Sequence, residues 1–113
     1  MHSMRAVQDG FAKWSASVIS RAPVDVQKKL AAGLALVNFR LPVIVMNLTK
    51  RPEVALMGFI DESGNVDVEG LRGAGQILAR GGWLSFKLPM LGGVDFTEDD
   101  IDDLCDCIEG GAL

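Results

Sequence analysis

The amino-acid sequence predicts an α+β domain that is predominantly α, with about five short helices and a small β-hairpin (Trp83–Phe96) before an acidic C-terminal helix. Three observations predict this class. Apolar residues recur at helical spacing in several segments, prolines and glycines separate those segments, and one run, Trp83–Leu88, alternates instead. At 113 residues, of which 49% are hydrophobic, the chain is expected to form a single domain, residues 1–113.

The first two helices are defined by their apolar positions and by Pro23. This proline is expected to end the first helix and to open the second, which runs from about Val24 to Phe39. Between Leu30 and Phe39 only Asn38 is polar, so the second half of this helix is expected to be buried on several sides, as a central helix or a subunit interface. The first helix carries one apolar stripe, formed by Met4, Val7, Phe11, Trp14 and Val18.

Prolines interrupt the middle of the chain. Pro42 breaks the direction of the second helix, and the run Val43–Met46 is too short for its periodicity to distinguish a strand from a short helix. Pro52–Ile60 is expected to form another short helix with proline at its start. Asp61–Asn65 has the composition of a turn.

The second half of the chain begins and ends with a predicted helix. Asp67 is expected to cap a helix from Val68 to Ala79, which two glycines then end. Thr97 is expected to cap the last helix, Glu98–Glu109. The apolar face of this last helix comprises Ile101, Leu104, Cys105 and Ile108.

The strand signal lies between these two helices. In Trp83–Leu88, apolar residues alternate with Ser85 and Lys87, which is typical of a half-buried strand. The short run Val94–Phe96 follows after a glycine-rich turn, so the two runs are expected to pair as a hairpin.

The sequence favours a cytoplasmic location. Met1–Gly10 contains no apolar segment of the signal-peptide type, and two cysteines are too few for a disulfide framework. Leu30–Leu48 is long enough to span a bilayer, but Arg40 falls near its centre, where a charge costs about 2.5–3.5 kcal/mol. We therefore expect two buried helices that meet near Pro42 rather than a membrane span.

No set of catalytic residues can be assembled from the sequence, so no enzyme and no cofactor are predicted. The single histidine, His2, lies at the N-terminus, which leaves no Ser-His, Cys-His or His-based metal site. Cys105 and Cys107 are two residues apart on a predicted helix and point in different directions, so they are not expected to bind one metal ion.

The acidic segment Asp61–Gly70 is similar to the start of an EF-hand loop in three positions only. Asp61, Ser63 and Asn65 supply oxygen atoms at the first, third and fifth positions. The sixth position is Val66 instead of glycine, and the twelfth is Arg72 instead of glutamate. We therefore interpret the segment as a turn before a capped helix, and leave open whether it binds a cation.

Charge is divided unevenly along the chain. Residues 1–60 hold eight basic and three acidic residues, whereas residues 61–113 hold three basic and twelve acidic ones. The overall acidic balance argues against direct nucleic-acid binding. The last helix is expected to be either a solvated face or a docking surface for a basic protein partner. The residues of this possible partner-binding surface are Glu98, Asp99, Asp102, Asp103, Asp106 and Glu109.

The leading hypothesis from the sequence is a small non-enzymatic interaction protein that forms a homo-oligomer. Self-association is expected through Leu30–Leu48, because this region is more apolar than a small domain needs to fill its core. Two alternatives are an acidic inhibitor or decoy whose C-terminal helix docks on a basic partner, and a carrier of an apolar small molecule. The residues expected to carry self-association are Leu34, Leu36, Phe39, Val43 and Val45.

Overall fold

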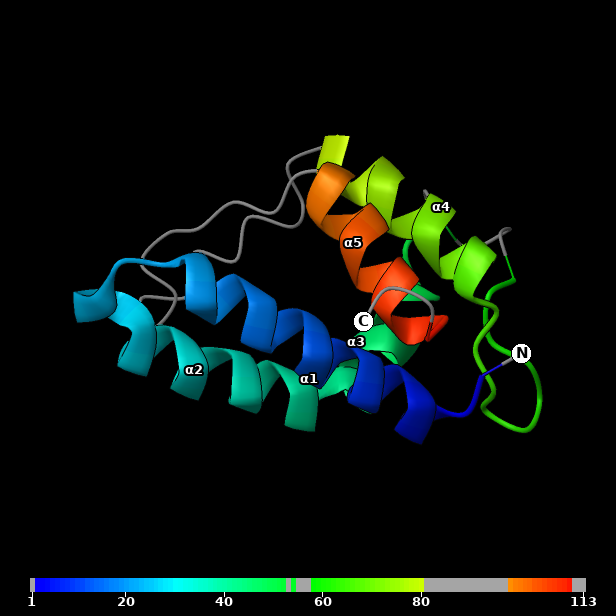
Figure 1. The fold of residues 1–113 in the computed structure, drawn as a ribbon. Coiled ribbons are helices and arrows are strands. Elements are labelled where there is room, and N and C mark those ends of the chain that lie inside the picture. Colours follow the sequence, from blue (N-terminus) through cyan, green and yellow to red (C-terminus); the bar gives the residue numbers. More distant parts are fainter. Residues whose placement is uncertain (1, 53, 55–57, 81–97, 111–113) are drawn as a thin grey trace.

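The computed structural model describes residues 2–52, 54, 58–80 and 98–110, and these residues form a helical domain. The helices are α1 (Met4–Arg21), α2 (Val24–Phe39), α3 (Leu41–Leu48), α4 (Val68–Arg80) and α5 (Glu98–Ile108). In Figure 1, α1 and α2 lie side by side in opposite directions, and α5 packs between α1 and α4.

The predicted α+β class is wrong for the part of the chain that the structure describes, because that part contains no strand. Its extended residues make only isolated bridges, in which Val66 pairs with His2 and with Ile60, too short a pairing to build a sheet. The predicted hairpin Trp83–Phe96 and the predicted cap Thr97 lie outside the described residues.

The predicted positions of the first two helices are confirmed. The second half of α2 is not buried on several sides within the chain, because Leu36 and Phe39 are exposed. Ser3 caps α1, since its hydroxyl oxygen accepts a hydrogen bond from the Ala6 backbone N–H at 3.1 Å. Pro23 precedes α2 as its N-cap. Of the predicted α1 stripe, Val7, Phe11 and Trp14 are buried, and Met4 and Val18 pack against the same core as partly buried residues.

Val43–Met46 is helical, because α3 extends over it with Pro42 in its first turn. The axes of α2 and α3 differ by 63°. No single helix among the described residues is long and apolar enough to cross a membrane, although α2 and α3 together meet that test by length and composition as a bent pair.

The predicted helix Pro52–Ile60 is not found in its described residues. Gly58 has a φ of 58°, in the left-handed region that a right-handed helix excludes. Phe59 is buried, and its carbonyl oxygen accepts a hydrogen bond from the Asp67 N–H at 2.9 Å. This part of the segment therefore packs as extended chain beside the start of α4.

The predicted turn and cap before α4 are confirmed. The Asp61 carboxylate accepts hydrogen bonds from the backbone N–H groups of Ser63 and Asn65 at 2.9 and 2.8 Å. The Asp67 carboxylate accepts one from the Glu69 N–H at 3.2 Å, as a helix cap does. The acidic residues of this segment thus organise the local backbone.

Two glycines let α5 approach its neighbours closely. A Cβ atom on Gly10 of α1 would lie 2.5 Å from the Ile108 Cα, in contact with the backbone of α5 itself. A Cβ atom on Gly75 of α4 would lie 2.9 Å from the Ile101 Cγ2, the end of a side chain. The main core lies where these helices meet, and its buried residues are Val7, Phe11, Trp14, Leu30, Leu34, Val37, Leu41, Val66, Val68, Cys105 and Ile108.

We predict that Gly10→Ala destabilises the protein even though alanine favours a helix by about 1 kcal/mol. The added methyl group meets the backbone of α5, which cannot rotate away, so a net loss of roughly 2 kcal/mol is expected, or a fall of about 10 °C in the melting temperature. Gly75→Ala is the matched control, because only a side chain has to move. An equal or higher melting temperature for Gly10→Ala contradicts the close α1–α5 contact.

Candidate interaction surfaces

The acidic helix α5 has a basic partner within the same chain, Arg72 of α4. Nη1 of Arg72 lies 2.9 Å from Asp102 Oδ1, and Nη2 lies 2.9 Å from Asp106 Oδ1. Glu69 and Glu109 approach the same guanidinium group at 3.5 and 3.8 Å. The Arg72 side chain is only 18% exposed, so it lies within the interface between α4 and α5.

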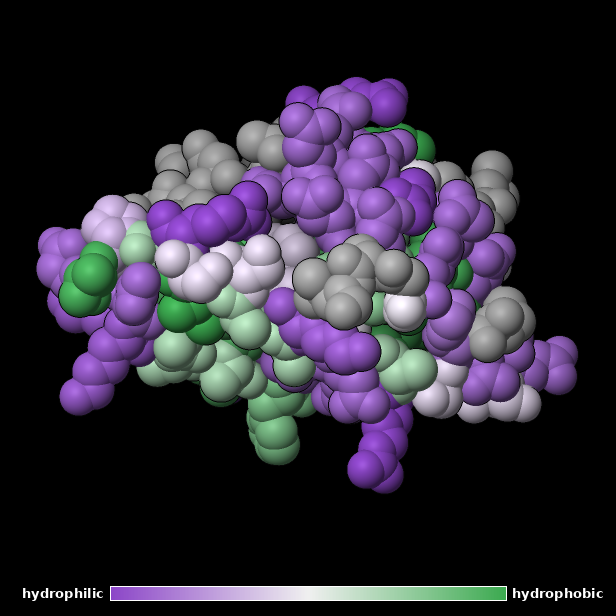
Figure 2. Space-filling view, in the orientation of Figure 1, coloured by the Kyte–Doolittle hydropathy of each residue, from purple (hydrophilic) through white to green (hydrophobic). Residues whose placement is uncertain are grey.

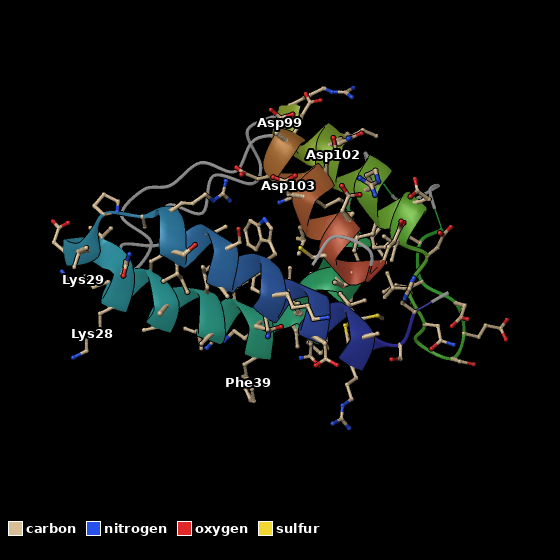
Figure 3. All side chains as sticks on the ribbon, viewed as in Figure 1. Lys28, Lys29, Phe39, Asp99, Asp102 and Asp103 are labelled. Atoms are coloured by element: carbon tan, nitrogen blue, oxygen red, sulfur yellow. The ribbon has the colours of Figure 1, made fainter. Side chains whose placement is uncertain are left out.

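Two further contacts attach α5 to α4. Gln76 donates a hydrogen bond from Nε2 to Asp102 Oδ1 at 2.9 Å, and Arg80 donates one from Nε to Glu98 Oε1 at the same distance. Several acids predicted to bind a partner are therefore engaged within the chain. Asp99 and Asp103 are exposed and form no ion pair with another described residue; Figure 3 shows both on α5 with Asp102.

The charges around Arg72 shift two pKa values. Burial lowers the pKa of Arg72, but its hydrogen bonds to Asp102 and Asp106 outweigh burial and raise the pKa overall, so the guanidinium stays charged. The hydrogen bond with Glu69 raises the pKa of Glu109 above that of an ordinary glutamate. Because the pKa of Glu109 is raised in the folded state, the protonated Glu69–Glu109 pair favours folding at low pH. This contribution to stability is lost as the pH rises through the raised pKa of Glu109.

The residues predicted for self-association divide into two groups. Leu34 and Val45 are buried in the two apolar cores and are not available to a partner. Leu36, Phe39 and Val43 are 37%, 80% and 62% exposed. Figure 2 shows apolar residues gathered along the lower edge of the molecule, where α2 lies.

Other exposed residues of α2 and α3 extend this apolar surface. Met46 is 50% exposed, and the small residues Ala32 and Ala35 are also exposed. We define the α2–α3 stripe as Ala32, Ala35, Leu36, Phe39, Val43 and Met46. Exposed basic side chains of Lys28, Lys29 and Arg40 lie on the same two helices or at their junction.

Neither cysteine is part of a reactive site. Cys105 is buried, and burial raises the pKa of its thiol to about 12. Burial also raises the pKa of Cys107, to which Asp103 and Asp106 add. No group of three or more His, Cys, Asp or Glu side chains in the described residues is placed to hold a metal ion.

Comparison with protein-family models, with curated proteins and with solved structures finds no match to this chain. Two features of its own surface bear on function. One is an acidic helix partly neutralised by Arg72, and the other is the exposed α2–α3 stripe.

We predict that Arg72→Met destabilises the protein by about 2–3 kcal/mol, because Asp102 and Asp106 are left without their cation at the α4–α5 interface. Arg80→Met is the control. It removes one exposed pair with Glu98 and should cost less than about 0.5 kcal/mol. Chemical denaturation of both variants measures the difference, and equal effects contradict the role assigned to Arg72.

The deficit of Arg72→Met should shrink as the pH falls through the raised pKa of Glu109, which lies near Arg72. Protonation of Glu109 weakens its pair with Arg72 in the native protein and removes one negative charge from the acids left without a cation in the variant. Denaturation at pH 7 and at about pH 4 measures this change. A deficit that stays constant or grows at low pH shows that the lost contacts are not electrostatic.

We predict that a thiol reagent modifies Cys107 before Cys105 in the folded protein, because Cys105 is buried and Cys107 is only partly buried. Both reactions should be slower than that of a free thiol, since both pKa values are raised and less thiolate is present. Mass spectrometry during alkylation gives the order. Rapid modification of Cys105 without unfolding contradicts the packing of α5.

Proposed function

We propose that this protein is a non-enzymatic interaction protein that self-associates through the α2–α3 stripe. The observation that carries the proposal is the exposure of Phe39, which at 80% presents nearly its whole side chain to solvent beside other exposed apolar residues. Covering such a side chain is favourable by about 2 kcal/mol. Leu36, Val43 and Met46 are also exposed, so covering them adds to this gain.

The position of the stripe supports a second copy as its occupant. The stripe lies on the side of α2 opposite to the core residues Leu30, Leu34 and Val37, so a partner can bind it without opening the fold. Stable interfaces cover about 800 Å² of each partner. Two copies meeting through this face bring both sets of apolar side chains out of water.

The alternative of an acidic inhibitor or decoy has less support. Asp102 and Asp106 are engaged by Arg72, and Glu98 by Arg80, so a basic partner would have to compete with contacts that attach α5 to α4. Neutralising these acids would also be expected to weaken the fold itself. The carrier of an apolar small molecule stays a prediction.

We predict that the protein at high micromolar concentration has a mass that is a multiple of 12.1 kDa. Phe39→Lys should weaken association by about a hundredfold, because it places a charge in the contact that the aromatic ring makes in each copy. Size-exclusion chromatography with light scattering measures both.

Ile77→Lys is the matched control, since Ile77 is also an exposed apolar side chain but lies on α4. It should leave the mass unchanged. A monomer at high concentration contradicts self-association, and an oligomer that persists in Phe39→Lys contradicts the assignment of its interface to the α2–α3 stripe.

A further inference from the structure

On one face of α2, the exposed residues follow one another at intervals that are the same when counted from either end. Lys28, Ala32, Ala35 and Phe39 follow one another at intervals of four, three and four residues. At 3.6 residues per turn, these intervals keep all four residues within one narrow stripe along the helix. All four are exposed.

The two ends of this face of α2 carry larger side chains than its middle. In Figure 3 the labelled side chains of Lys28 and Phe39 extend from the same side of α2, away from α1 and α5. Ala32 and Ala35 lie between them along the helix and carry only methyl groups. The face therefore has a low centre that admits another helix closely, with a cation at one end and an aromatic ring at the other.

We infer that a second copy packs antiparallel against this face, about a two-fold axis that passes between Ala32 and Ala35. This inference rests on the proposed self-association and specifies its geometry. The axis places Ala32 of one copy against Ala35 of the other, and Lys28 against Phe39 at both ends of the contact. Each ring is then covered by the apolar stem of a lysine, whose ammonium group is attracted to the ring.

The charge pattern favours this orientation over a parallel one. A parallel pair places Lys28 against Lys28 and Lys29 near Lys29, which brings like charges together. The antiparallel pair separates the Lys28 side chains by about 16 Å along the axis, at about 1.5 Å for each intervening residue. It also brings Asp25 of one copy toward Arg40 of the other, and both of these residues are exposed.

Disulfide trapping in the full chain tests this geometry. The background carries Cys107→Ser, while Cys105 is kept because it is buried in the core. Lys28→Cys and Phe39→Cys are purified separately, mixed and oxidised. The mixed dimer keeps one native contact between Lys28 and Phe39, so it can form even where the Phe39→Cys protein alone has dissociated.

We expect a disulfide-linked dimer in the mixture and little from either variant alone, because Cα atoms more than about 7 Å apart cannot be bridged. Ala16→Cys, on the exposed side of α1, replaces Lys28→Cys in a control mixture that should give no linked dimer. Light scattering of each sample before oxidation reports association independently of the disulfide.

The outcomes separate this inference from the proposed function. A linked dimer of Lys28→Cys or Phe39→Cys with itself indicates a parallel contact, which overturns the antiparallel geometry but leaves self-association standing. Association without a disulfide in the Lys28→Cys and Phe39→Cys mixture also overturns the geometry. A monomeric unmodified chain overturns both.

Discussion

The contact of Arg72 with Asp102 and Asp106 holds the last helix, α5, against α4. It attaches α5, which carries a concentrated negative charge, to α4 through the Arg72 side chain, which is only 18% exposed. Gly10 and Gly75 then allow α5 to lie close to α1 and α4. Without the cation, the acids of α4 and α5 would repel one another across the interface that the core requires.

This arrangement changes the meaning of the uneven charge in the sequence. In the sequence, the acidic helix has the pattern of a docking surface for a basic partner. In the structure, part of its charge is paired with Arg72 and Arg80 of the same chain. The opposite side of the molecule presents exposed apolar and basic side chains on α2, as Figure 3 shows for Lys28, Lys29 and Phe39. Among the described residues, α2 and α3 thus carry exposed apolar side chains on the side of α2 that faces away from the core.

Local signals in the sequence predicted the helix ends and the core face of α1, because capping and periodicity act within a few residues. They failed at Pro52–Ile60, where Gly58 takes a left-handed conformation. They also could not separate buried Leu34 from exposed Phe39, since a helix that is apolar almost all round has no periodic face. The pairing of Arg72 with α5 was not predicted, because its acidic partners lie about 30 residues away in the sequence. The available signal was the spacing of Asp102 and Asp106, which lie one helical turn apart on α5.

We propose that the surface of α2 and α3, rather than that of α5, binds another molecule of this chain. Hydrogen–deuterium exchange at low and high protein concentration tests it most directly, because an interface protects its own segment only when it is occupied. We predict that protection rises with concentration in peptides from Val24–Leu48 and stays constant in Glu98–Ile108. A rise confined to Glu98–Ile108, or no change in either segment, contradicts it.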